Sequence, residues 1–129
     1  MANDFTALGS AIYSKLGGTA ATPPVYYALA PQGSTPPYII VQRLSGVDEY
    51  TFNSQGVNTE YVVKAVSNRI WPTEAWATYG SVHPTLQNAT LAITGFTSLR
   101  CQRKSTIEYI DPDRYWHVGG IYRIEAWQT

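Results

Sequence analysis

Hydrophobic residues recur along the chain with two different periods, and each period predicts one kind of element. Close to the start, apolar residues three and four positions apart predict one face of a helix: Phe5, Leu8, Ile12 and Leu16. Asn3 or Asp4 can cap this helix, and Gly17-Gly18 supplies a left-handed stop.

A second helix is predicted over residues 72–87. Pro72 suits the first turn of a helix, where its missing N–H costs nothing. The inward stripe of this helix is spaced by three and four residues: Trp76, Tyr79, His83 and Leu86. Pro84 lies late in the segment and predicts a kink or an early end.

A period of two, or a β-branched run, predicts four longer strands: 38–44, 58–67, 97–110 and 115–127. In the last strand the alternation predicts a core-facing set: Trp116, Val118, Tyr122, Ile124 and Ala126. Gly119-Gly120 in the middle of that strand predicts a bulge or a bend.

Two segments between these elements are irregular. Five of the eight prolines lie within residues 19–37, which confines that stretch to a loop or a sheet border, with Val25–Tyr27 as a short strand at or near an edge. Residues 45–57 are polar and flanked by glycines, so they predict a long loop between two strands. A loop of about 12 residues is uncommon unless it has a function.

The resulting order of elements is helix, three strands, helix, two strands. Hairpin connections imply a mostly antiparallel sheet of about four to five strands, with the two helices packed on one face. The chain shows no internal repeat or linker, so residues 1–129 are predicted to form a single α+β domain.

Composition favours a protein that assembles with partners. Charged residues make up only 14% of the chain, against about 25% in a typical domain. Nine basic residues balance nine acidic ones, which argues against binding to duplex DNA. We expect no membrane span and no secretory signal, because no apolar run is long enough and the first residues lack the signal pattern.

The sequence offers no recognisable catalytic or metal-binding constellation. Cys101, the only cysteine, falls on the apolar face of a predicted strand, where a thiol is a structural residue rather than a nucleophile. His83 and His117 are too far apart in the sequence for a zinc motif. We therefore expect neither an enzyme nor a cofactor or metal site.

Several residues are candidates for an interface with other proteins. Large aromatic residues are more numerous than a core of this size needs, and aromatics are enriched at interfaces. The one basic cluster on a predicted strand suits either a solvated sheet face or the lining of a pore. The candidates are Tyr50, Phe52, Trp71, Tyr115, Arg100, Arg103 and Lys104.

The layout resembles the tail-terminator (tail-completion) proteins of long-tailed bacteriophages. A helix is followed by a Val-Tyr strand and then, about ten residues on, by a Pro-Tyr-(Ile/Val) strand. The matching segments cover nearly the whole chain: Val25-Tyr26-Tyr27, Pro36-Pro37-Tyr38-Ile39-Ile40-Val41, 58–67, 72–87, the Leu-x-Ile at 91–93 and the Tyr-Arg-Ile at 122–124. The helix with Pro84 and the tryptophan-rich segment 71–76 depart from the usual pattern.

The resemblance implies a structural protein of the virion, assembled in the host bacterial cytoplasm. Proteins of this family form a hexameric ring on the head-proximal end of the tail tube, stop its polymerisation and join the tail to the neck or head. DNA would pass through the lumen of such a ring without sequence-specific binding. The 45–57 segment is the candidate for the element that projects toward the tube, and the 100–104 cluster is a candidate for the lumen lining.

Two other interpretations stay open. The first is another head–tail connector component, such as a head-closure or minor tail protein, which also forms rings. The second is a small ligand-binding or enzymatic α+β domain, for which a deep pocket beside His83 and Tyr79 would be expected.

Overall fold

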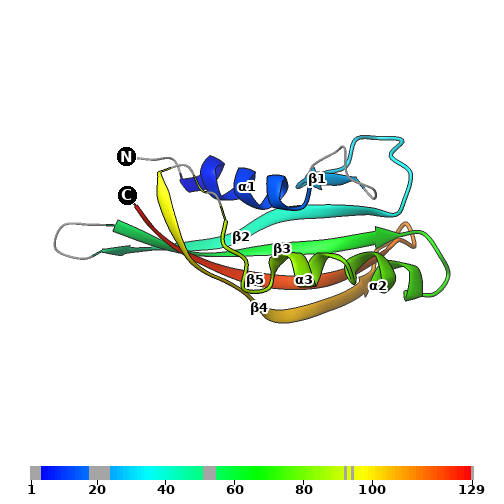
Figure 1. Cartoon of the computed structure of the whole chain (residues 1–129). Helices are drawn as coiled ribbons and strands as arrows, with labels where there is room; N and C mark the ends of the chain where they lie inside the picture. The colour runs from blue at the N-terminus through cyan, green and yellow to red at the C-terminus, as the bar shows by residue number, and fades with distance from the viewer. Residues whose placement is uncertain (1–3, 18–23, 51–54, 92, 94, 129) are drawn as a thin grey trace.

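The computed structural model of the chain describes residues 4–17, 24–50, 55–91, 93 and 95–128. In these residues a five-stranded sheet carries helices on one face (Figure 1). The elements are α1 (Asp4–Lys15), β1 (Val25–Tyr27), β2 (Tyr38–Tyr50), β3 (Gln55–Ser67), α2 (Thr73–Tyr79), α3 (Val82–Leu86), β4 (Phe96–Ile110) and β5 (Trp116–Gln128).

The strands lie in the order β1-β2-β3-β5-β4. Only β1 pairs in parallel, with β2; the other three pairings are antiparallel. The predicted α+β class with a mostly antiparallel sheet is thus confirmed, and so is the prediction of a short strand over Val25–Tyr27 at or near an edge, where β1 is the edge strand. The other edge is β4.

The core lies between the sheet and the helices. Leu8 and Ile12 of α1 are fully buried against it, as the helical spacing predicts. The strands contribute the alternate residues on the helix-covered side, among them Tyr61 and Val63 of β3. The core-facing residues predicted for the last strand are also buried, except Trp116, which is partly buried: Val118, Tyr122, Ile124 and Ala126.

The predicted long loop over 45–57 is wrong. Strands β2 and β3 stay paired as far as Tyr50 opposite Gln55, so most of this segment is a β-hairpin. The reason is tertiary pairing, because β3 is also bound to β5 along this stretch, with Gly56 opposite Trp127. Strand pairing of this kind overrides the weak local preferences of glycine and polar residues.

The predicted second helix is divided into α2 and α3 at Gly80 and Ser81. Pro84 is the third residue of α3, within the first turn, where a backbone N–H has no partner inside the helix. The break therefore precedes the proline instead of following from it. Tyr79 and Leu86 of the predicted stripe are buried, and His83 is partly buried.

Of the bulge or bend predicted at Gly119-Gly120, the bulge is wrong, because β5 runs through both glycines in unbroken register with β3. The register shifts lie in the neighbouring edge strand β4, between Ser98 and Arg100 and between Arg103 and Ser105. Gly119 instead allows the backbones of β5 and β3 to lie very close together. A Cβ atom on Gly119 would lie 2.2 Å from the backbone oxygen of Val63.

Candidate assembly surfaces

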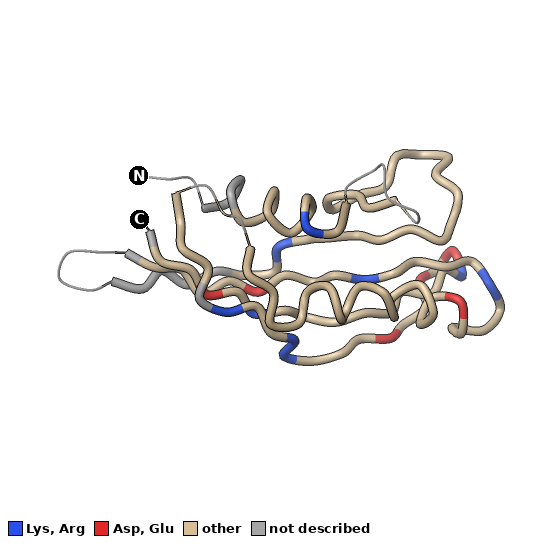
Figure 2. Tube along the Cα trace, viewed as in Figure 1, with Lys and Arg blue, Asp and Glu red and all other residues tan. Residues whose placement is uncertain are grey.

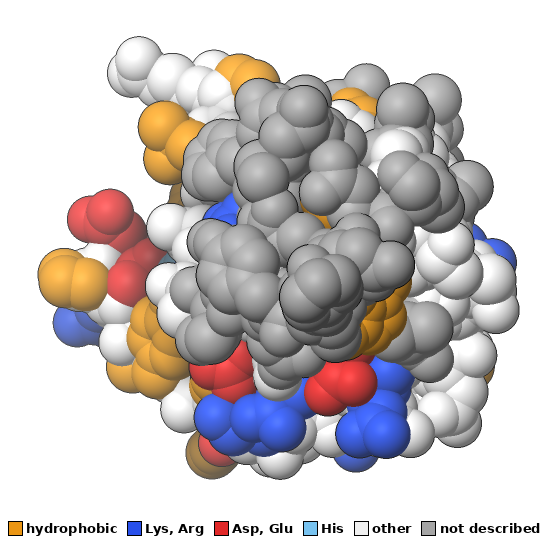
Figure 3. Space-filling model, turned by 90° about the vertical axis from the view of Figure 1, so that its left-hand side faces the viewer, with side chains coloured by type: hydrophobic (Ala, Val, Ile, Leu, Met, Phe, Trp, Pro, Cys, Tyr) orange, Lys and Arg blue, Asp and Glu red, His pale blue; other side chains and the backbone are white. Residues whose placement is uncertain are grey.

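The sheet face opposite the helices carries a band of paired charges. Lys104 of β4 reaches across β5 and forms an ion pair with Glu60 of β3 at 2.7 Å, and Arg100 lies 3.9 Å from Glu125. Figure 2 shows basic and acidic residues at several points along the strands, and Figure 3 shows basic and acidic side chains side by side along one margin of the molecule. Exposed pairs of this kind contribute little to stability.

The structure divides the predicted basic cluster between the two faces of the sheet. Arg103 lies on the helix-covered side, where its guanidinium donates to the Tyr79 hydroxyl at 3.4 Å. This hydrogen bond is the main reason why the pKa of Arg103 is raised. Only Arg100 and Lys104 remain on the open face.

A polar network lies beneath Arg103, between the sheet and the helices. The hydroxyls of Tyr79 and Tyr122 are 2.6 Å apart, and His83 Nδ1 lies 2.9 Å from the Tyr122 hydroxyl. Burial, followed by the hydrogen bond to Tyr79, raises the pKa of Tyr122 far above its usual value. These polar groups bond to one another, which accounts for polar side chains at core positions.

The loop between β3 and α2 presents two adjacent apolar side chains to solvent. Ile70 is 86% exposed and Trp71 is 73% exposed. The loop is held in place from β5, because Trp116 Nε1 donates to the carbonyl of Ile70 at 3.0 Å. An ion pair between Arg69 and Glu74 spans it at 3.0 Å. Trp71 was predicted as an interface residue, whereas Ile70 was missed because a single aliphatic residue carries no such signal.

The remaining predicted interface residues give less information. Tyr115 lies at the turn before β5, and its backbone N–H donates to Asp111 Oδ1 at 3.0 Å. Tyr50 is the last residue of β2, and its side chain is outside the described part of the chain. Phe52 is likewise outside the described residues. The interface role of all seven residues stays a prediction.

Three side chains of β3, β4 and β5 pack together near the Ile70–Trp71 loop. The rings of Tyr109 and His117 are parallel at 4.7 Å, and Lys64 donates to the Tyr109 hydroxyl at 2.8 Å. His117 Nε2 lies 2.7 Å from Asp111 Oδ2. Burial lowers the pKa of His117, and the opposing effect of the Asp111 carboxylate is smaller.

This burial predicts that stability falls as the pH drops below about 6.5. The pKa values of His83 and His117 are both lowered by burial in the folded chain, so the unfolded chain takes up protons first. Urea denaturation at pH 7.5, 6.5 and 5.5 checks this, and H117Q should flatten the profile. Equal stability at all three pH values would contradict it. Burial alone would raise the pKa of Asp111, but its hydrogen bonds lower it overall. Protonation of Asp111 therefore reduces stability only below about pH 4 and does not affect this pH range.

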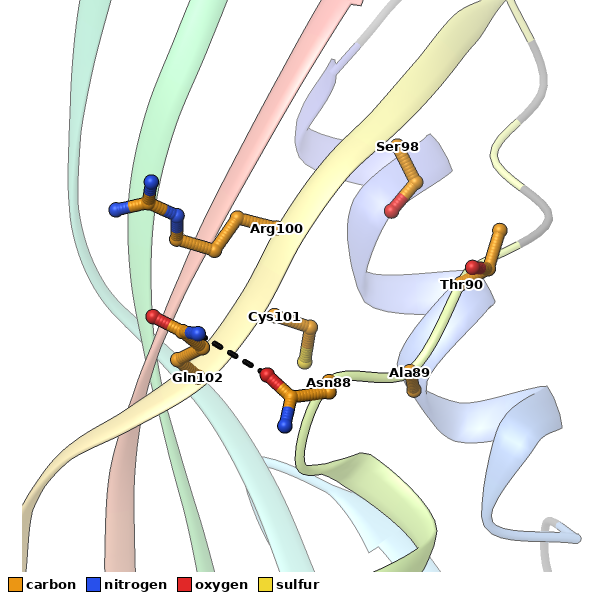
Figure 4. Close-up of a pocket in the computed structure, with 7 residues that line it drawn as sticks. All are labelled: Asn88, Ala89, Thr90, Ser98, Arg100, Cys101 and Gln102. Atoms are coloured by element: carbon orange, nitrogen blue, oxygen red, sulfur yellow. Dashed lines mark hydrogen bonds between the residues drawn. The ribbon is translucent and has the colours of Figure 1, made fainter.

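A small hollow lies beside β4 (Figure 4). It has a volume of about 220 Å³ and is lined by Asn88, Ala89, Thr90, Ser98, Arg100, Cys101 and Gln102. It is smaller than the ~300–1,000 Å³ typical of ligand pockets, and neither His83 nor Tyr79 lines it. Burial raises the pKa of the Cys101 thiol to about 11, so the thiol stays protonated at neutral pH.

Two further observations concern the described residues as a whole. They contain no group of three or more His, Cys, Asp or Glu side chains that could hold a metal ion. Within the same residues, the helices are too short or too polar to cross a membrane.

The described residues form a small α+β domain with an exposed apolar loop at Ile70 and Trp71. A family model described as "Tail completion protein gp17" matches residues 6–129. The chain therefore belongs to the family of tail completion proteins, as the sequence layout predicted, and it has a structural role in completing a phage tail. A search of curated proteins finds no match.

A solved structure shares the whole fold. It is a chain from the virion of a native gene transfer agent particle, with a TM-score of 0.84. The similarity covers 98% of this chain and 99% of that one, at 16% sequence identity. At this identity the comparison shows the fold alone.

Proposed function

We propose that this chain is a tail terminator, which forms a hexameric ring on the head-proximal end of the tail tube. The ring stops tube polymerisation and provides the joint to the neck or head, while DNA passes through its lumen without sequence-specific contacts. The observation that carries the proposal is the tail-completion family match over residues 6–129. The shared fold with a chain of a gene transfer agent virion supports it.

The arrangement of surfaces suits a closed ring. A ring needs two different patches on each subunit in head-to-tail contact. The exposed apolar loop at Ile70 and Trp71 is a candidate for one of these two patches. The β2–β3 hairpin extends at the opposite end of the sheet, away from this loop (Figure 1). In this proposal the hairpin contacts the tube, and Arg100 and Lys104 on the open face line the lumen.

Electron microscopy of the purified protein mixed with tail tubes tests this function. A terminator caps tubes only at the head-proximal end, and light scattering measures whether the free protein is already a hexamer in solution. Binding to the neck or portal side without capping would instead support the alternative, a head-closure or other connector protein. Decoration along the tube wall would contradict both functions.

Replacing Trp71 by alanine should abolish or strongly weaken capping while leaving the fold intact. The side chain is 73% exposed, so we expect the free energy of unfolding to change by less than about 0.5 kcal/mol. Capping efficiency by microscopy and thermal unfolding measure the two effects. W71F keeps an apolar ring and serves as the matched control. Normal capping by W71A would remove Trp71 from the interface.

A further inference from the structure

The first half of the outer edge of β4 is covered by the chain itself. The Cys101 carbonyl accepts from the backbone N–H of Asn88 at 2.8 Å. The backbone N–H of Arg103 donates to Gln87 Oε1 at 2.9 Å. Both groups point away from β5, so the segment Gln87-Asn88 occupies the position of a further strand there.

The second half of this edge is uncovered. Arg103 and the other outward-facing residues of β4 lie opposite even-numbered residues of β5. Past the register shift these are Thr106, opposite Gly120, and Glu108, opposite Val118. Within the described part of the chain, no group bonds to the outward N–H and C=O of Thr106 and Glu108, and both residues are exposed.

Residues 105–110 also lack the usual features that protect a strand edge. Proteins keep free edges from pairing with lysine, proline or a bulge. The segment Ser-Thr-Ile-Glu-Tyr-Ile contains neither Lys nor Pro, and the register shifts of β4 lie before it. Its one charged side chain, Glu108, accepts from Trp76 Nε1 at 2.6 Å on the helix-covered side. A further strand can therefore pair with this segment.

The other outer strand, β1, offers no comparable edge. Val25 is fully buried, and the Tyr27 carbonyl accepts from the backbone N–H of Leu29 at 2.8 Å. Of the two outer strands, only β4 thus has free backbone groups for a second copy, and these can meet only their own counterparts. Two copies of one strand pair symmetrically when they are antiparallel, because the slanted bonds of a parallel pair join non-equivalent residues. Such a contact is isologous, with a two-fold axis.

The covered half of the edge limits where this axis can lie. Outward-facing residues must meet outward-facing residues, so the axis passes through one residue of the segment. An axis at Thr106 would place Tyr109 of the second copy beside Arg103, where Gln87 already lies. The axis must therefore lie further along β4.

Two other positions are excluded by the residues that they would bring together. An axis at Glu108 would place two carboxylates directly opposite each other, which is unfavourable. An axis at Tyr109 would place Pro112, which has no N–H, opposite Thr106. An axis at Ile107 avoids both conflicts and ends the pairing just before the covered half.

We propose that this chain forms a dimer in which β4 pairs antiparallel with β4 of a second copy, about a two-fold axis at Ile107. Thr106 exchanges both backbone hydrogen bonds with Glu108 of the second copy, and Ser105 faces Tyr109. The two sheets then continue into each other. Because an isologous contact is complete with two copies, it is separate from the head-to-tail contacts of the proposed ring and does not depend on them.

Cysteine cross-linking tests this register directly. Two Ile107 residues would form a non-hydrogen-bonded pair with Cα atoms about 4.5 Å apart, which a disulfide can span. Under oxidising conditions I107C alone should give a disulfide-linked dimer on a denaturing gel, since the native Cys101 is buried. S105C and Y109C should each stay monomeric, and their mixture should give a heterodimer. Absence of the I107C dimer, or dimers of S105C alone, would overturn the proposal.

Charge substitutions give a second, independent measurement. Residue 106 faces Glu108 of the second copy twice in the dimer. T106K should therefore lower the dissociation constant of the dimer about tenfold, and T106E should raise it about tenfold. Analytical ultracentrifugation measures both, with circular dichroism as the folding check. Equal dissociation constants for T106K and T106E would overturn the contact.

The outcomes separate this inference from the terminator function. Capping of tail tubes by a chain whose I107C variant gives no disulfide would overturn the dimer and leave the terminator function intact. An I107C disulfide in a chain that never caps tubes would support the dimer and overturn the function. A free chain that stays monomeric at about 1 mM would overturn the dimer.

Discussion

Replacing Gly119 by alanine is expected to destabilise the protein by at least about 3 kcal/mol. A Cβ atom there would lie 2.2 Å from the Val63 oxygen and 2.6 Å from the Lys64 Cα. These are backbone atoms of the neighbouring strand, so no side chain can rotate away. The two central strands would have to separate. Urea denaturation of G119A, followed by circular dichroism, measures the loss.

The matched control is G80A. Gly80 lies between α2 and α3 with helical backbone angles, and the nearest atom to an added Cβ is the Ala77 oxygen at 3.2 Å. Alanine also reduces the entropy of the unfolded chain, so the change should stay within about 1 kcal/mol. An unfolding midpoint of G119A equal to that of G80A would show that the strands do not approach as closely as described.

Removing the Tyr122 hydroxyl is expected to cost about 2 kcal/mol. The variant Y122F leaves His83 Nδ1 without this partner and the Tyr79 hydroxyl with only the long contact to Arg103. Unpaired polar groups in a core are penalised because they have lost water without gaining a partner. Thermal and urea unfolding both detect a loss of this size.

Two further variants make this expectation specific. Y109F removes a hydroxyl that bonds Lys64 on the exposed face, and its effect should stay below about 1 kcal/mol. The double variant Y79F/Y122F removes both hydroxyls of the pair, so its cost should be less than the sum of the single costs. Additive costs would show that the two tyrosines do not interact.

The helices and most of the strands could be predicted because burial enforces a period. Leu8 and Ile12 must lie on one helical face, and Val118, Tyr122 and Ile124 must lie on one sheet face, so their spacing alone carries the information. The spacing of apolar residues was therefore enough to predict an element wherever one of its faces is buried in the core. Trp71 is exposed, and its role in an interface stays a prediction.

The wrong predictions share a different cause. The extended β2–β3 hairpin is set by pairing with β5, which the residues of 45–57 do not encode locally. A bulge was predicted at the glycines of β5, but the bulges lie in β4. Gly119 is instead required because the backbone of β3 lies too close to it for a side chain. Each of these features depends on a strand distant in sequence.

The bulges in β4 also mark the positions where a residue could be inserted or deleted without changing the rest of the sheet. Lys104 is the extra residue between Arg103, opposite Tyr122, and Ser105, opposite Ile121. A chain without it would align these same pairs in a regular ladder, and every inward residue would keep its side. At the second register shift, between Ser98 and Arg100, one residue could be lost in the same way. Relatives that gain or lose single residues in their outermost strand can therefore do so without disturbing the interior.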